Sequence, residues 1–163
     1  MVTSVTLRAA AKINIGLHIM GKRPDGYHLL ETLYYPVHEL SDVMHFQRDV
    51  GEECQIIMEG FNGKLALEDN LCYKAWKLMS EELEKKNTGL RLHLKKEIPA
   101  GAGLGGGSSN AATVMRGLRE LWGVDVSDEK LAQWGERLGA DVPFFIYNKP
   151  MYGTCLLYTS DAA

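Results

Sequence analysis

The chain has 163 residues, of which 45% are hydrophobic, and its formal net charge at neutral pH is −3. That length is enough for the hydrophobic core of one ordinary domain, whereas two full domains would be difficult to accommodate. The charges are interspersed and show no basic stripe, which argues against binding to nucleic acid.

The cysteines and the hydropathy pattern point to a cytoplasmic protein. Cys54, Cys72 and Cys155 are odd in number and widely spaced, which fits a reducing compartment better than a disulfide framework or a zinc site. No apolar run approaches the roughly 20 residues that span a bilayer, and the N-terminus lacks a signal-peptide pattern. We therefore expect no membrane segment.

The N-terminal part of the chain alternates between apolar and polar residues, which is typical of strands with one buried face. Residues 5–9 and 13–19 follow this pattern as two half-buried strands or one bent strand. The Pro-Asp-Gly sequence within residues 21–26 predicts a turn. The apolar positions of the first segments are Val5, Leu7, Ala9, Ile13, Ile15, Leu17 and Ile19, and further strands are predicted over residues 31–37, 42–46, 55–58 and 90–95.

From Asn70 onward the apolar residues recur at helical spacing. Capping residues, and glycines that end the periodic segments, mark the helix boundaries. A run of strands with interspersed later helices is typical of the α+β class. The predicted helices run from Asp69 or Asn70 to Asn87, from Ser108 or Ser109 to Gly123, and from Ser127 to Gly139.

The last residues of the chain lack the sequence signals of secondary structure that the rest of the chain shows. After Pro150, residues 155–163 show no turn signal, no periodicity and no cap. We expect one domain over residues 1–154, followed by a tail at 155–163 that is truncated or foreign to the natural sequence.

The glycine-rich run from Pro99 to Ala112 is the most informative segment. Five glycines fall within residues 101–107, and a helical pattern follows at once. Such a corner lets backbone N–H groups converge at a helix N-terminus, where the dipole favours an anion. A nucleotide phosphate is its natural occupant. A flexible Gly-Ser linker is the alternative, but it does not account for the helix that follows.

Other glycine motifs fit the same run less well. Gly101-x-Gly103-x-x-Gly106 satisfies the dinucleotide-binding fingerprint of nicotinamide-dependent dehydrogenases, but the alternating segment before it does not read as a buried parallel strand. The Walker A pattern fails because Gly107 stands where the lysine is required. A non-catalytic module that contacts RNA is a further alternative, against which the mild acidity argues.

Two charged residues could supply chemistry if the fold brings them together beside the glycines. Lys12 lies in an otherwise apolar strand, and Asp141 lies in a loop before apolar residues. Taken singly, an edge-strand lysine and a turn aspartate are the commoner interpretations. As a pair, the aspartate could accept a hydroxyl proton while the lysine stabilises developing negative charge, which suits phosphoryl transfer.

The segment from Pro99 to Ala112 resembles the phosphate-binding loop of the GHMP kinases. The resemblance implies the α+β fold of their N-terminal domain, a ribosomal-protein-like two-layer sandwich built on βαβ units, with a ferredoxin-like C-terminal domain missing. Turnover by this chain is therefore expected to be low or absent. Four further motifs extend the resemblance in the same order, namely Ala11–Leu17, Arg23–His28, Glu68–Leu71 and Gly139–Pro143.

Within that family, the motifs resemble the members that use ATP and Mg²⁺ to phosphorylate the 2-hydroxyl of 4-(cytidine 5′-diphospho)-2-C-methyl-D-erythritol. This reaction belongs to the non-mevalonate route to isoprenoid precursors in bacteria and plastids, and the lack of a transit-like leader favours a bacterial cytoplasm.

The resemblance also implies roles for single residues. Asp141 would be the general base, with Lys12 as its charge-stabilising partner. Asn14 would help to hold the substrate, and Tyr27 and His28 would lie at the cytosine. No residue is predicted as a metal ligand. The nucleotide would be bound by Asn70, Lys96, Pro99, Ala100, Gly101, Ala102, Gly103, Leu104, Gly105, Gly106, Gly107, Ser108, Ser109 and Asn110.

Overall fold

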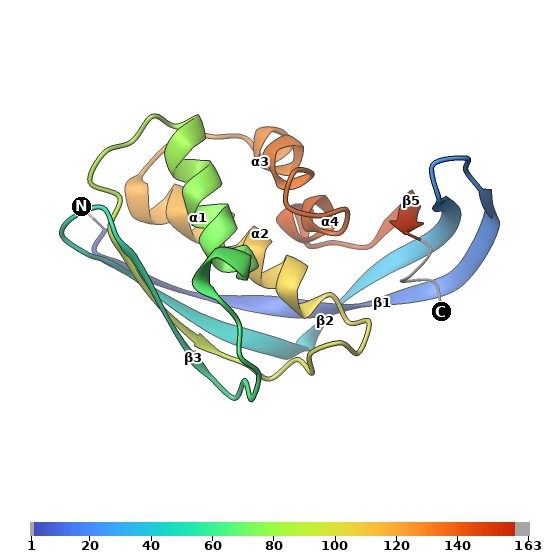
Figure 1. Cartoon of the computed structure of the whole chain (residues 1–163), viewed down its shortest axis with the longest axis horizontal. Coiled ribbons are helices and arrows are strands. Elements are labelled where there is room, and N and C mark those ends of the chain that lie inside the picture. Colours follow the sequence, from blue (N-terminus) through green and yellow to red (C-terminus); the bar gives the residue numbers. More distant parts are fainter. Residues whose placement is uncertain (1, 159–163) are drawn as a thin grey trace.

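The computed structural model describes residues 2–158 and shows one mixed β-sheet with helices on one of its faces (Figure 1). This arrangement confirms the predicted α+β class. Among the described residues, none of the helices combines the length and apolar character needed to cross a membrane.

The strands are β1 (Ser4–Lys22), β2 (Tyr27–Arg48), β3 (Cys54–Glu59), β4 (Leu90–Lys95) and β5 (Met151–Tyr158). The helices are α1 (Leu71–Glu82), α2 (Gly106–Trp122), α3 (Asp128–Gly135) and α4 (Val142–Tyr147), with a short 3-10 turn η1 (Leu67–Asp69) before α1.

The long strand β2 organises the sheet. The strand order is β1-β2-β4-β3, and β5 also pairs with β2. The first part of β2, residues 27–34, pairs with β5, and the last part of β2, residues 43–48, pairs with β4. β1 runs antiparallel beside both parts of β2. The β1–β2 hairpin that they form extends past the helices (Figure 1). The strands predicted at 31–37 and 42–46 are therefore parts of one strand.

The core lies between the sheet and α2. The inner face of β4 buries Leu90, Leu92 and Leu94, while the residues between them are at least partly exposed. This alternation confirms a strand with one buried face, as predicted from the sequence. Burying each large apolar side chain contributes about 1.5–3 kcal/mol. Fully buried partners on β2 and α2 include Met44, Phe46, Ala111, Val114, Met115 and Leu118.

The predicted helix starts agree well with the structure, and two of the predicted ends do not. Asn70 caps α1 by accepting a hydrogen bond from the Cys72 N–H at 2.9 Å, but α1 ends at Glu82 and not at Asn87. α2 begins at Gly106, two residues before the predicted Ser108, and ends before Gly123 as predicted.

The third predicted helix is shorter than expected, and a helix that was not predicted follows it. Ser127 caps α3 as expected, since its hydroxyl accepts a hydrogen bond from the Lys130 N–H at 3.1 Å. The helix ends at Gly135, so the predicted continuation to Gly139 is wrong. A further helix, α4, follows directly after Asp141, with Pro143 in its first turn. Proline is tolerated there because the N–H that it lacks has no partner within the first turn of a helix. Asp141 lies directly before this helix, at its N-cap position.

β1 changes its buried face along its length. Near its start the odd-numbered residues Val5 and Ala9 are buried, but beyond a register shift between Ala10 and Ala11 the even-numbered Lys12 is buried, with 8% of its surface exposed. The expectation that the isoleucine series faces the core is wrong for the second half of β1. The exposed apolar residues there are Ile13, Ile15, Leu17 and Ile19, which are 40–58% exposed.

The predicted tail begins inside β5. The backbone of residues 151–158 pairs with β2, although the sequence of 155–158 carries no strand signal that we detected. Residues 159–163 lie outside the described residues. That the tail is truncated or foreign stays a prediction.

Candidate active site

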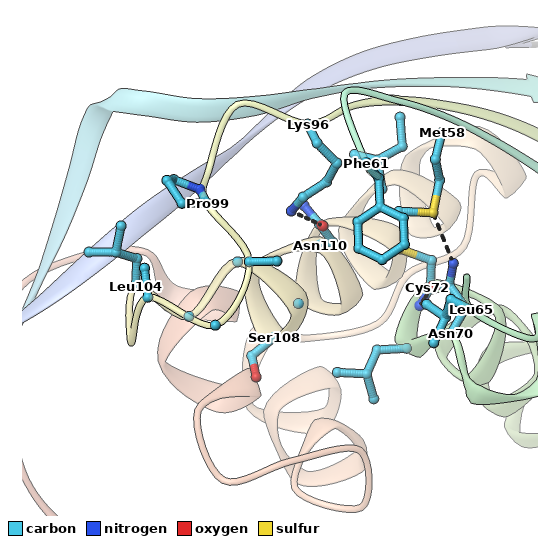
Figure 2. A pocket seen from close by; sticks show the side chains of 18 of the residues that line it. Met58, Phe61, Leu65, Asn70, Cys72, Lys96, Pro99, Leu104, Ser108 and Asn110 are labelled. Carbon is cyan, nitrogen blue, oxygen red and sulfur yellow. Dashed lines mark hydrogen bonds between the residues drawn. The ribbon is translucent and has the colours of Figure 1, made fainter. Parts of the chain in front are cut away.

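A cavity of about 460 Å³ opens between the glycine-rich loop, the start of α1 and the end of β3 (Figure 2). Its volume lies in the range of small-molecule sites, about 300–1,000 Å³. One end is apolar, lined by Met58, Phe61 and Leu65, and the other end is formed by the glycine loop with Lys96 and Asn110. An apolar slot beside a polar, glycine-lined pocket suits a ligand with a flat ring at one end and an anion at the other. Of the predicted nucleotide residues, those that line this cavity are Asn70, Lys96, Pro99, Ala100, Gly101, Ala102, Gly103, Leu104, Gly105, Gly106, Gly107, Ser108 and Asn110.

The glycine loop ends at the N-terminus of α2. Gly101, Gly103 and Gly105 all have positive φ, and the first intrahelical bond runs from the Ser109 N–H to the Gly105 carbonyl at 2.9 Å. The N–H groups of Gly106, Gly107 and Ser108 therefore lack partners within the helix. Converging N–H groups in such a loop, together with the positive end of the helix dipole, make an anion site.

Gly105 is packed tightly by residues from other elements. Its φ is +72°, and a Cβ at this position would lie 2.7 Å from the Phe145 Cζ and 3.0 Å from the Lys12 Cγ. Phe145 is 1% exposed and belongs to α4. The glycine is thus required both by its conformation and by the close approach of α4 and β1.

Lys12 and Asp141 meet beside this glycine. The Lys12 Nζ lies 3.9 Å from the Asp141 Oδ2, and these side chains are 10% and 23% exposed. The same Nζ donates a hydrogen bond to the Asn14 Oδ1 and lies 5.8 Å from the centre of the Tyr34 ring. The Lys12 backbone N–H donates to the Leu104 carbonyl at 2.9 Å, which ties β1 to the loop.

α4 is held in place by its aromatic residues, and this fixes Asp141 at its start. The Phe144 ring packs on the Tyr34 ring with centroids 5.2 Å apart. Arg116 of α2 donates a hydrogen bond to the Phe145 carbonyl at 3.3 Å. These contacts set the position of Asp141 relative to β2 and the glycine loop.

Sequence reasoning missed one buried residue behind the cavity. Asp42, on β2, is 0% exposed and accepts hydrogen bonds from the Lys96 Nζ at 2.5 Å and the Asn110 Nδ2 at 2.8 Å. Lys96 also donates to the Asn110 Oδ1 at 3.0 Å (Figure 2). The signal was present in the sequence, because an aspartate occupies the same strand face as Met44 and Phe46.

Some of the predicted site residues lie away from the cavity. Ser109 does not line it, because its hydroxyl donates to the Ala10 carbonyl at 2.6 Å and so faces β1. Tyr27 and His28 begin β2 at the far end of the hairpin, where His28 pairs with Lys22. The Tyr27 side chain lies outside the described part of the structure. Their roles stay predictions.

The two described cysteines are expected to be unreactive in the folded chain. Burial raises the pKa of the Cys54 thiol, and that of Cys72 in the cavity wall, from 9.0 to about 12. Because the thiolate is the reactive species, Ellman's reagent at pH 8 should label neither thiol until the chain unfolds. The measurement is made in a Cys155→Ser background, and fast labelling of the native chain would contradict it.

The same pKa shifts give a pH dependence of stability. Above pH 9 the unfolded chain ionises thiols that the folded chain keeps protonated, so the free energy of unfolding should fall as the pH rises from 9 toward 12. Replacing both cysteines with alanine should flatten this part of the profile.

Comparisons with known proteins show what this chain is similar to. Residues 70–149 match the GHMP kinases N terminal domain. The 4-diphosphocytidyl-2-C-methyl-D-erythritol kinase of Nitrosomonas europaea is 44% identical over 141 residues, which are 86% of this chain and 50% of that protein. The kinase of the same name from Acinetobacter baumannii is 45% identical over 143 residues, which are 88% of this chain and 50% of that protein.

A solved structure gives the same result. The crystal structure of a 4-(cytidine 5′-diphospho)-2C-methyl-D-erythritol kinase has a TM-score of 0.76 and 36% sequence identity, over 92% of this chain and 52% of that one. The chain spans about half the length of the curated relatives it matches. Identity to these kinases over most of the chain, the matching domain and the shared fold together show that the chain belongs to the GHMP kinases and carries their N-terminal domain.

Proposed function

We propose that this chain supplies the ATP-binding and catalytic residues of a 4-diphosphocytidyl-2-C-methyl-D-erythritol kinase. The reaction would transfer the γ-phosphoryl group of ATP to the 2-hydroxyl of 4-(cytidine 5′-diphospho)-2-C-methyl-D-erythritol. The observation that carries the proposal is the 3.9 Å approach of Lys12 and Asp141 beside Gly105. Residues so distant in the chain meet here next to an anion-binding helix N-terminus.

The nucleotide would lie along the cavity. Its phosphates would accept hydrogen bonds from the first N–H groups of α2 and from Lys96, and its base would occupy the apolar end near Met58 and Phe61. This orientation directs the terminal phosphate toward Gly105, where Lys12 and Asp141 lie.

Asp141 and Lys12 would then act on the acceptor. The Asp141 carboxylate would take the proton of the acceptor hydroxyl as its oxygen bonds to the γ-phosphorus, and the bond from that phosphorus to the β–γ bridging oxygen would break to release ADP. The Lys12 ammonium would stabilise the negative charge that develops on the transferring group. Asn14 would hold Lys12 in position, because it accepts a hydrogen bond from Nζ.

Mg²⁺ fits this arrangement as an ion that accompanies the nucleotide. Mg²⁺ prefers oxygen ligands and usually keeps phosphate oxygens and water in its shell. The Ser108 hydroxyl faces the segment before α4, since a Cβ on Gly139 would lie 3.8 Å from its Oγ. The described residues contain no cluster of three or more His, Cys, Asp or Glu side chains suited to holding a metal. The ion would neutralise phosphate charge, with Ser108 as its protein ligand.

The rest of the acceptor would extend along the hairpin. Asn14 donates to the Thr32 hydroxyl at 3.4 Å, which continues the polar lining from Lys12 onto β2. His28 has the same parity on β2 as Thr32 and therefore lies on the same strand face. A substrate bound along this face of the strand, with its acceptor hydroxyl at Asp141, would thus place its cytidine at His28.

Two measurements test the proposal. Titration of this chain with ATP and, separately, with NADH should show binding of ATP only, whereas tight NADH binding without any effect of ATP would support a dehydrogenase instead. Phosphorylation of the cytidine-diphospho substrate is then followed with this chain and with a form fused to the C-terminal half of the Nitrosomonas europaea kinase. ATP binding without phosphoryl transfer in either form would reject the proposed reaction.

A further inference from the structure

Asp42 is a buried carboxylate that lies behind the nucleotide cavity. Its Oδ1 accepts hydrogen bonds from the N–H groups of Glu97 at 2.7 Å and Ile98 at 2.8 Å. Its Oδ2 accepts from Lys96 at 2.5 Å and from Asn110 at 2.8 Å. One side chain on β2 therefore binds the segment that leads into the glycine loop, the cavity lysine and the first turns of α2.

Lys96 needs such a counter-ion where it lies. Its side chain is 9% exposed, and a Cβ on Gly106 would lie 3.2 Å from its Nζ, so the ammonium sits against the N-terminus of α2. Burial and the positive end of the helix dipole both disfavour a cation at this point. The Asp42 carboxylate offsets both effects.

The hydrogen bonds that Lys96 donates also fix the orientation of its ammonium group. Among the described residues, Asp42 and Asn110 accept two of the three N–H donors of its ammonium, which leaves one donor for a ligand in the cavity. The Glu97 and Ile98 bonds fix the backbone just before Pro99, where the loop begins. Lys96 and the loop are thus held in place before any ligand binds.

We propose that Asp42 is a positioning residue for nucleotide binding, which acts by orienting Lys96 and by anchoring the entrance of the glycine loop. The inference rests on the proposed binding of ATP. Asp42 itself touches no ligand, and its effect passes through residues that do.

The test uses isosteric variants and a matched control. Asp42→Asn replaces an acceptor with an amide donor that opposes the Lys96 ammonium. Lys96→Met removes the ammonium and keeps most of the side chain. The double variant restores a neutral pair. The control is Asp49→Asn, because Asp49 also pairs with a cation, in this case Arg91 of β4 at 3.0 Å, but away from the cavity.

Two readouts are followed, namely affinity for a fluorescent ATP analogue and amide hydrogen exchange at Glu97 and Ile98. Asp42→Asn should weaken binding about tenfold or more and speed exchange at these amides, as loss of a charge-assisted hydrogen bond does. The double variant should bind the analogue as Lys96→Met does and should regain slow exchange. Asp49→Asn should change neither readout.

Defined results would overturn the proposal. Unchanged affinity and exchange in Asp42→Asn would do so. A double variant that binds far more weakly than Lys96→Met alone while exchange at Glu97 and Ile98 stays slow would also do so, because Asp42 would then act through neither Lys96 nor the loop entrance. If Asp42→Asn does not fold, the comparison of the double variant with Lys96→Met decides. If the unmodified chain binds no ATP analogue, the proposed function fails, while exchange at Glu97 and Ile98 still decides whether Asp42 anchors the loop.

Discussion

Replacing Gly105 with alanine is expected to abolish nucleotide binding while most of the fold persists. At φ +72° a non-glycine residue costs about 1–2 kcal/mol. The new Cβ would also lie 2.7 Å from the Phe145 Cζ and 3.0 Å from the Lys12 Cγ. Phe145 is buried in α4, so relief of the overlap must shift the loop or Lys12, at a further cost of about 1–3 kcal/mol.

Gly103→Ala is the matched control for this prediction. Its φ is +73°, but a Cβ there meets nothing within 4 Å, so only the conformational cost applies. Titration with ATP and thermal unfolding of the two variants separate these contributions. The double variant Gly105→Ala/Phe145→Leu should regain part of the affinity. Equal losses at Gly103 and Gly105 would show that the contact with Phe145 is unimportant.

Asp141→Asn should lower the rate of phosphoryl transfer by about 10²–10⁴-fold, because the amide cannot accept the acceptor's proton. Affinity for ATP should stay nearly unchanged, since the proposed nucleotide contacts are made by the loop and Lys96. Lys12→Met should also lower the rate while keeping the alkyl packing against Gly105. The measurement is single-turnover transfer from labelled ATP in the fused form.

The control for the carboxylate is Asp128→Asn. Asp128 also lies at the start of a helix, as the first residue of α3, but it pairs with Arg119 at the surface at 2.7 Å, away from the cavity. This variant should retain the rate of the unmodified protein. A rate in Asp141→Asn within a few-fold of the unmodified protein would mean that another group accepts the proton.

The sequence allowed accurate prediction of features governed by local chemistry. Helix caps at Asn70 and Ser127 are visible because short polar side chains satisfy the first free N–H groups of a helix. The glycine loop was recognisable because its composition permits left-handed backbone and close approach. The alternating strand at residues 90–95 followed from a period of two.

Features set by distant contacts were not predictable in the same way. α4 has only six residues and depends on packing of Phe144 and Phe145 against β2 and the glycine loop. Short helices carry little periodic signal, because tertiary packing stabilises them more than propensity does. Asp42 was missed for a related reason, since its partners come from the segment after β4 and from α2.

The reversal of the buried face along β1 affects how related sequences are aligned. Side chains in a strand alternate between its faces, so the one-residue change of parity near Ala10 and Ala11 decides whether a lysine or an isoleucine occupies the inner position. Alanines surround this point and offer an alignment little to distinguish one from the next. A gap misplaced by a single column would equate Lys12 with a solvent-facing Ile13, and the position proposed here as catalytic would be lost from the comparison.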